Sequence, residues 1–287
     1  MTVSEERSLG NVGLAFVGAG NMAEAMIRGL LDDGAIESDS ISVNNRQDRE
    51  RLRRLEEIYG VSASESKEGM LSDSDVIILA VKPGDFEECV EEMFPHVRRD
   101  HLVISVLAGI PSARIREFFP HNTIIRAMPN TSARIGAGIT ALSYPEDIDA
   151  ANRRIARIIF ESVGVVVTVD ERLLDAVTGL SGSGPAYIYY IAEALADAGE
   201  ELGLDREVAL RLAVETIAGA GEMLKNGKAP IDLRREVTSA GGTTEAGIRI
   251  LDRGGFSKTL KSAVEGAARR SREMAESCGS SDTRRAI

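Results

Sequence analysis

The first 169 residues alternate short apolar runs rich in β-branched residues with segments in which apolar residues recur at helical spacing. This alternation is typical of a parallel sheet flanked by helices. The run from Val76 to Val81 holds no polar residue, which indicates a central strand covered on both faces. Strands are predicted at residues 12–17, 41–44, 75–81, 102–106, 123–127, 139–142 and 163–169. Helices are predicted between them at residues 22–31, 49–59, 86–94, 112–118 and 148–162.

After residue 170 the β-branched runs vanish, and helical spacing continues nearly to the end of the chain. One helix is predicted at 186–202 behind Pro185, and another is predicted to begin after Asp205 and to end at Gly227. A length of 287 residues is more than one hydrophobic core usually serves. We expect an α/β domain with a doubly wound parallel sheet over 1–169, an all-α domain over 170–278 and a disordered tail over 279–287.

The helical half carries mostly alanine and glycine on its apolar faces, as at Ala209, Ala213 and Ala220. Such faces let helices approach closely but bury little apolar surface. The all-α domain is therefore predicted to complete its core against a second copy of the chain, which makes the protein a homodimer.

Charge and composition exclude several classes of protein. The formal net charge is −11 and 4% of residues are aromatic, which disfavours binding of nucleic acid. Cys89 and Cys278 lack the spacing of a zinc site or a redox pair, so we expect no metal and a reduced, cytoplasmic location. The amino terminus has no apolar signal segment and no apolar run could span a bilayer, so no membrane anchor is expected.

A glycine-rich turn follows the first predicted strand. The segment Gly18-Ala-Gly20-Asn-Met-Ala23 matches the pattern GxGxxA and runs directly into a predicted helix. Gly18 allows the turn, Gly20 lets the backbone approach a pyrophosphate, and Asn21 and Met22 open the helix whose free N–H groups bind phosphate. The plainer alternative is a glycine turn in another αβ unit, but strand, spacing and helix together favour a Rossmann-like dinucleotide site.

The second strand ends in Asn44-Asn45-Arg46, where enzymes that use NAD usually place a carboxylate for the ribose hydroxyls. No acid is present there. Asn45 and Arg46 are predicted to surround a 2′-phosphate, which favours NADPH as cofactor while leaving NADH open. The alternative is that Arg46 is an exposed turn residue.

Three later loops are expected at the same edge of the sheet, where open α/β sheets bind ligands. They contain Val81-Lys82-Pro83, Ala108-Gly109 and Met128-Pro129-Asn130. Lys82 is predicted to contact phosphate or ribose, and Asn130 to orient the nicotinamide. Either residue could equally structure its own loop, Asn130 especially, because asparagine after proline favours turns.

The chemistry is narrowed by what these sites lack. His96, His101 and His121 each precede a predicted strand, at the edge of the sheet opposite to the cofactor loops, and the helical half holds no histidine. Neither a histidine acid nor a metal is therefore expected to assist hydride transfer. A protonated imine is an acceptor that needs little proton chemistry from the protein.

The helical half contains two glycine-rich passages that a purely structural bundle would avoid, at residues 179–187 and 237–248. In the second, Gly241 and Gly242 precede Thr243 and Thr244 at a predicted helix start. Such a loop can turn successive N–H groups toward a carboxylate, while Ser239, Thr243 or Thr244 supplies a hydroxyl. The alternative is that Thr243 or Thr244 is only the N-cap of the helix.

At this point the chain resembles the pyrroline-5-carboxylate reductase family along nearly its whole length. The matching segments are Gly18–Leu30, Val81–Pro83, Arg126–Thr131, Ser181–Tyr187 and Leu233–Asp252. The resemblance implies reduction of 1-pyrroline-5-carboxylate to L-proline with NADPH or NADH. It also implies dimers formed through interleaved helical domains, with five dimers commonly assembling into a decamer. It also implies that Ser239 to Thr244 hold the substrate carboxylate, that Thr244 lies beside the imine nitrogen, and that the nicotinamide lies against Met128 to Asn130.

Two alternatives differ in class. β-Hydroxyacid dehydrogenases also combine a glycine turn with a helical domain, but they place a catalytic lysine where this chain has Ile188. A non-catalytic dinucleotide-binding regulator would have no need for Gly241 to Thr244. Both alternatives are therefore disfavoured.

Overall fold

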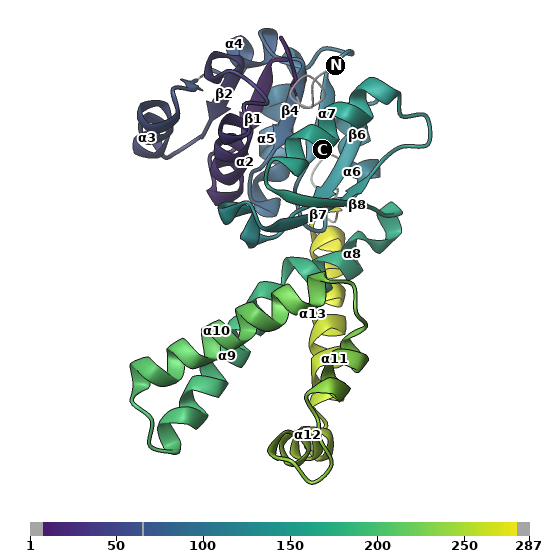
Figure 1. Cartoon of the computed structure of the whole chain (residues 1–287). Coiled ribbons are helices and arrows are strands. Elements are labelled where there is room, and N and C mark those ends of the chain that lie inside the picture. The colour runs from purple at the N-terminus through teal and green to yellow at the C-terminus, as the bar shows by residue number, and fades with distance from the viewer. Residues whose placement is uncertain (1–7, 65, 280–287) are drawn as a thin grey trace. The chain divides into compact units, whose positions relative to one another are not determined.

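The computed structural model describes residues 8–64 and 66–279, with side chains as far as Met274 (Figure 1). Packing divides it into two compact units. The described residues up to Gly182 pack with those from Gly266 onward, and Ser183–Glu265 forms the second unit. From the sequence, an α/β domain was expected to end at residue 169 and an all-α domain to begin at residue 170. These expected domain boundaries stay a prediction. Gly279 ends a helix, and residues 280–287 of the expected disordered tail lie outside the described residues.

The first unit contains an eight-stranded sheet of order β3-β2-β1-β4-β5-β6-β7-β8. Its strands are β1 (Leu14–Val17), β2 (Ile41–Asn44), β3 (Ser62–Ala63), β4 (Val76–Leu79), β5 (Leu102–Ser105), β6 (Thr123–Met128), β7 (Gly138–Ser143) and β8 (Gly164–Thr168). The seven predicted strands are all present. β3 was missed, because a strand of two residues, one of them a serine, gives no apolar run.

The expectation of a wholly parallel sheet is wrong at one pair of strands. β6 and β7 run antiparallel, whereas every other neighbouring pair is parallel. A parallel crossover needs a dozen or more residues. The chain between Met128 and Gly138 is shorter than that and turns at Gly136, whose φ is 70°. The short connection therefore reverses the chain direction.

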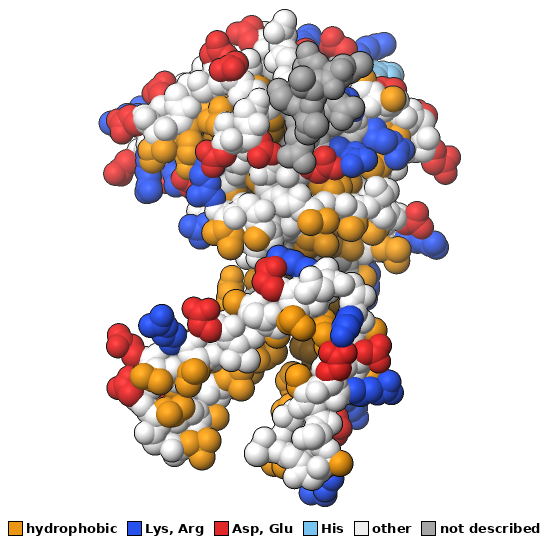
Figure 2. All heavy atoms as spheres, viewed as in Figure 1, with side chains coloured by type: hydrophobic (Ala, Val, Ile, Leu, Met, Phe, Trp, Pro, Cys, Tyr) orange, Lys and Arg blue, Asp and Glu red, His pale blue; other side chains and the backbone are white. Residues whose placement is uncertain are grey.

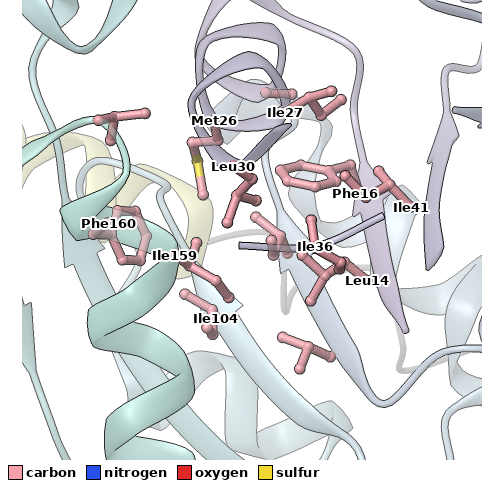
Figure 3. Close-up of a cluster of buried hydrophobic side chains, with 14 of the residues drawn as sticks. Leu14, Phe16, Met26, Ile27, Leu30, Ile36, Ile41, Ile104, Ile159 and Phe160 are labelled. Atoms are coloured by element: carbon pink, nitrogen blue, oxygen red, sulfur yellow. The ribbon is translucent and has the colours of Figure 1, made fainter. Parts of the chain in front are cut away.

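Helices cover both faces of the sheet. They are α2 (Asn21–Asp32), α3 (Arg49–Tyr59), α4 (Lys67–Ser72), α5 (Phe86–Met93), α6 (Ser112–Phe118) and α7 (Ala150–Glu161). Leu14 and Phe16 of β1 point into a core with α2 and α7, where Met26, Ile159 and Phe160 pack (Figure 3). The intervening residues Ala15 and Val17 join a second core, which α4, α5 and α6 cover. This alternation buries β1 completely.

Several short elements complete the first unit. One-turn 3₁₀ helices lie at Ser38–Ser40, Pro83–Asp85, Phe94–His96, Thr131–Ile135 and Glu171–Leu173, and α8 (Leu174–Val177) leads into a π-helical turn at Thr178–Gly182. α13 (Phe256–Gly279) begins in the second unit, and its residues from Gly266 onward belong to the first, where Ser271 Oγ donates to the Asp175 carboxylate of α8 over 2.6 Å.

The second unit is helical, as predicted. It contains α9 (Gly184–Glu201), α10 (Arg206–Lys225), α11 (Pro230–Glu236), α12 (Thr243–Arg253) and the first part of α13. Asp205 caps α10 by accepting hydrogen bonds from the N–H groups of Glu207 and Val208. The buried apolar side chains of residues 183–265 are three alanines, Ala196, Ala209 and Ala213. Larger apolar groups such as Tyr190 and Leu202 are exposed, and Figure 2 shows apolar side chains along these helices.

This unit therefore buries almost none of its large apolar side chains within one chain, which agrees with the expected need for a second copy. In the described residues no helix combines the length and apolar character that crossing a membrane requires.

Candidate cofactor and substrate sites

The glycine turn after β1 is held between two neighbouring strands. Gly18 has a φ of 108°, and its N–H donates to the carbonyl of Asn44 over 3.0 Å. A Cβ at this position would lie 2.5 Å from the carbonyl oxygen of Ala80. No other residue fits there, because both the dihedral angle and the space demand glycine.

Gly20 differs from Gly18 in what surrounds it. It occupies the N-cap position of α2 with an ordinary φ of −73°, and a Cβ there would meet no atom within 4 Å. The open space in front of Gly20 and the free N–H groups at the start of α2 fit the close approach of a pyrophosphate. Asn21 and Met22 are the first two residues of this helix.

A hollow of about 420 Å³ extends from this turn along the carboxyl ends of β2 and β4. Six of the predicted cofactor residues line it, namely Gly18, Gly20, Asn45, Arg46, Val81 and Lys82. No carboxylate stands at the end of β2 within it, as expected from the sequence. Asp48, Asp85 and Glu92 line it elsewhere.

The other predicted cofactor residues lie outside this hollow. Pro83 opens the 3₁₀ turn after β4, and Gly109, with a φ of 75°, lines a separate hollow of about 360 Å³ behind β5, next to Ala108. Met128 ends β6, and its methyl group lies so near Gly182 that a Cβ there would be 2.8 Å away. The side-chain oxygen of Asn130 accepts a hydrogen bond from the N–H of Ile139 over 3.3 Å. This contact agrees with the alternative that Asn130 structures its own loop.

Arg51 of α3 supports the turn and was missed in the sequence. Its Nε donates to the carbonyl of Ala19 over 3.0 Å, and its guanidinium pairs with Glu24 of α2. Burial would raise the pKa of Glu24, but hydrogen bonding and the charge of Arg51 outweigh burial and hold this pKa below its ordinary value. Arg51 therefore ties the turn to α2 and α3. Because Arg51 lies 27 residues from Glu24 and 32 residues from Ala19, no local pattern indicates these contacts.

A second unpredicted network lies behind β5 and β6. The guanidinium of Arg126, whose side chain is 6% exposed, donates to the carbonyl of Leu107 over 2.9 Å and pairs with Glu171 over 3.4 Å. Glu171 in turn accepts hydrogen bonds from both the N–H and the hydroxyl of Ser112. Leu107 and Ser112 flank the loop that carries Ala108 and Gly109. The ion pair of buried Arg126 with half-buried Glu171 therefore fixes both ends of that loop.

Of the three histidines expected at the edge of the sheet away from the cofactor loops, His101 has a structural role. His101 is buried, accepts a hydrogen bond from Arg98 N–H at Nδ1, and contacts the carbonyls of Leu71 and Ser74 through Nε2. Burial lowers its pKa. His96 lies nearer the cofactor groove than expected, because it lines a hollow of about 330 Å³ that also contains Arg46. Within the described part of the chain, no group of three or more His, Cys, Asp or Glu side chains could hold a metal ion.

The glycine-rich loop of the second unit precedes α12. Gly241 has a φ of 74°, and its N–H donates to the Glu245 carboxylate over 2.7 Å. Gly242 is the N-cap residue and Thr243 the first residue of the helix, so neither threonine is the cap. Ser239, Thr243 and Thr244 are all exposed. The alternative that confined a threonine to capping is wrong, and both hydroxyls remain accessible to a ligand.

Fold and groove together define a dinucleotide-dependent oxidoreductase. Residues 13–109 match the family model described as NADP oxidoreductase coenzyme F420-dependent, and residues 171–274 match pyrroline-5-carboxylate reductase dimerisation. The chain is 43% identical over 265 residues to pyrroline-5-carboxylate reductase 2 of Bacillus subtilis, covering 92% of this chain and 95% of that one. It is 40% identical to the reductase of Arabidopsis thaliana, covering 92% and 96%.

Solved structures agree. A pyrroline-5-carboxylate reductase from Coxiella burnetii superposes with a TM-score of 0.85 at 35% identity, covering 92% of this chain and 99% of that one. The Plasmodium falciparum pyrroline carboxylate reductase with NADP bound gives a TM-score of 0.83 at 29% identity, covering 92% and 98%. The chain belongs to the pyrroline-5-carboxylate reductase family.

The two turn glycines predict different outcomes on substitution. Gly18→Ala should lower the free energy of unfolding by about 2 kcal/mol or more, because it combines strain with a backbone clash. Gly20→Ala should leave the free energy of unfolding within about 0.5 kcal/mol of wild type, because the added methyl group meets no protein atom. It should nevertheless weaken NADPH binding at least tenfold, because the methyl group would occupy the space that the pyrophosphate approaches. Denaturant titration and NADPH fluorescence measure the two quantities. Unchanged NADPH affinity in a folded Gly20→Ala protein would place the pyrophosphate elsewhere.

The loop network makes a second prediction. Glu171→Ala should lower the free energy of unfolding by about 2 kcal/mol, because it leaves the buried charge of Arg126 without its partner. The neighbouring Arg172→Ala removes only an exposed pair with Asp170 and should change stability by about 0.5 kcal/mol at most. Urea unfolding of both variants measures these changes. A loss of unfolding free energy in Glu171→Ala no larger than that in Arg172→Ala would contradict a stabilising role of the Arg126–Glu171 pair.

Proposed function

We propose that this chain reduces the C=N bond of 1-pyrroline-5-carboxylate to L-proline with NADPH, the last step of proline biosynthesis, and that NADH also serves. The observation that carries the proposal is the combination, in one chain of this family, of a dinucleotide groove in which Asn45 and Arg46 directly follow β2 and a glycine-rich, hydroxyl-bearing loop in the helical half. Residues 1–169 bind the cofactor, and residues 170–278 bind the substrate and form the dimer.

In the cofactor groove, the pyrophosphate binds at the glycine turn and the start of α2, which comprise Gly18, Gly20, Asn21 and Met22. Asn45 and Arg46 surround the 2′-phosphate, since a guanidinium fork matches a phosphate dianion. The open space at Gly20 supports this placement, because a Cβ there would project toward the ligand.

Further residues position the nicotinamide end. Lys82 contacts phosphate or ribose, and the loops with Val81, Pro83, Ala108, Gly109, Met128 and Asn130 border the ring. The position of these loops after β4, β5 and β6, at the carboxyl edge of the sheet, supports the assignment.

In the helical half, Ser239, Gly241, Gly242, Thr243 and Thr244 hold the substrate carboxylate through hydroxyl and N–H groups at the start of α12. Thr244 is the catalytic residue, and its hydroxyl lies beside the imine nitrogen, where it donates a hydrogen bond to the lone pair that forms on this nitrogen as hydride adds to the carbon. A bound NADPH would supply the hydride that the imine carbon accepts, and the C=N electron pair would move to the protonated nitrogen. Because no further proton is needed, the protein acts mainly by holding two reactants in register, which contributes about 7 to 11 kcal/mol when geometry is good.

The protein is a homo-oligomer. Within this statement, we propose a homodimer formed through the helical half and a decamer of five such dimers, located in the cytoplasm. Exposed apolar residues on α9 and α10, among them Tyr190, Leu195 and Leu212, support the dimer surface. The two cysteines, which lack the spacing of a zinc site or a redox pair, support this location.

Activity and the role of Thr244 can be tested together. The purified protein should oxidise NADPH when 1-pyrroline-5-carboxylate is added, with proline as product. Thr244→Ala should lower kcat at least tenfold, or about 1.4 kcal/mol, because the hydrogen bond to the imine nitrogen is lost. Its NADPH dissociation constant should not change, since the turn that receives the cofactor belongs to the other unit.

Thr244→Ser is the matched control, because it keeps the hydroxyl and should restore most of kcat. An unchanged kcat in Thr244→Ala would restrict Thr244 to a structural role. Absence of turnover with both NADPH and NADH in the wild type would overturn the assigned reaction.

The oligomer makes a separate prediction. Light scattering should give the mass of at least two chains, and of ten chains if the dimers assemble fully. Tyr190→Glu should weaken the assembly, because its side chain is 73% exposed within one chain and a charge cannot be buried between copies. Glu193→Gln on the same helix serves as control. A folded, active monomer would contradict the shared core.

A further inference from the structure

Two ion pairs join α5 to the basic residues of the cofactor groove. Glu88 pairs with Arg46, which follows β2, and Glu92 pairs with Lys67, the first residue of α4. Arg46, Lys67 and Glu92 line both the 420 Å³ hollow and the adjoining 330 Å³ hollow. The basic groups nearest the end of β2 are therefore already engaged by carboxylates of this chain.

The sequence of α5 explains why its acids face the groove. Phe86, Cys89, Val90 and Met93 are buried against the sheet. Glu88 and Glu92 are four residues apart and so share one helix face, away from that buried stripe. Asp85 precedes the helix and lines the same hollow. The pKa of Arg46 is raised, first by its hydrogen bond with Glu88 and then by the charge of Glu88, with smaller effects of Glu92 and Asp85.

A carboxylate and a phosphate compete for the same N–H groups of an arginine or a lysine. The side chains of Arg46 and Glu88 are 48% and 59% exposed, so their pair is solvated and readily exchanged. NADH has a ribose hydroxyl in place of the 2′-phosphate and can bind with the pair intact. NADPH has to displace Glu88 and then places its phosphate near a helix face that carries further negative charge.

We propose that Glu88 and Glu92 are specificity-determining residues that compete with the 2′-phosphate for Arg46 and Lys67 and thereby lower the preference for NADPH over NADH. The inference rests on the proposed placement of the 2′-phosphate at Arg46. It adds an opposing element to that site, on a helix that the glycine motif and the β2 loop do not include.

The test uses the full-length protein and two cofactor fragments that differ by one phosphate, 2′,5′-ADP and 5′-AMP, with binding measured by titration calorimetry. Glu88→Gln should tighten 2′,5′-ADP about threefold, the range expected for releasing an exposed ion pair, and leave 5′-AMP unchanged. Glu88→Gln combined with Glu92→Gln should tighten it further. In steady-state kinetics the KM for NADPH should fall relative to that for NADH, with kcat constant.

Glu91→Gln is the matched control, since it removes the same charge from the same helix. Like Glu88, Glu91 lines neither hollow, but the acids that raise the pKa of Arg46 are Glu88, Glu92 and Asp85. An equal gain in Glu91→Gln would reduce the effect to net charge and overturn the inference. Weaker 2′,5′-ADP binding in Glu88→Gln would also overturn it, because Glu88 would then orient Arg46 for the phosphate.

Arg46→Gln separates this inference from the proposed function. If Arg46→Gln leaves 2′,5′-ADP affinity unchanged, the phosphate is not held at Arg46 and the proposed cofactor placement fails, together with the competition. If Arg46→Gln weakens 2′,5′-ADP but Glu88→Gln changes nothing, the cofactor placement stands and the competition alone is refuted.

Discussion

The contact between Gly18 and the end of β4 is the constraint on which the cofactor groove depends. Gly18 donates to Asn44 of β2, while Ala80 after β4 donates to Val17 at the end of β1. The turn is thus hydrogen-bonded to both neighbouring strands, and the absence of a side chain at Gly18 allows its backbone to pack against that of Ala80. α2 can then start directly at the edge of the sheet. Its position is fixed further along by Gly29, where a Cβ would be 2.6 Å from the carbonyl of Ser162.

This constraint explains why the cofactor part of the chain was predictable. The strand, the glycine spacing and the helix start are contiguous in sequence, so the pattern contains both the local structure and the reason for it. The same holds for α3 and α6, whose predicted bounds agree with the structure, and for Asp205, whose capping depends only on its next neighbours.

Features that depend on distant residues were not predictable. Arg51 contacts Ala19 and Glu24 from the next helix along the chain. Arg126 contacts Leu107, 19 residues before it, and Glu171, 45 residues after it. An arginine in a sequence does not reveal which carbonyl it will find. The reversed direction of β7 was missed for a different reason, since strand direction follows from connection length rather than from the apolar pattern of the strand.

The charge of the protein sets a problem that the site has to solve locally. A chain with a net charge of −11 binds two anions, and long-range repulsion therefore opposes binding. Arg46, Lys67 and Lys82 concentrate positive charge in one hollow, yet Asp85 and Glu92 line the same hollow. Since exposed charges are screened over about 8 Å at physiological salt, only these neighbours act strongly on a bound phosphate. Cofactor preference then depends on the balance of a few side chains at the groove, and the overall acidity of the chain does not determine it.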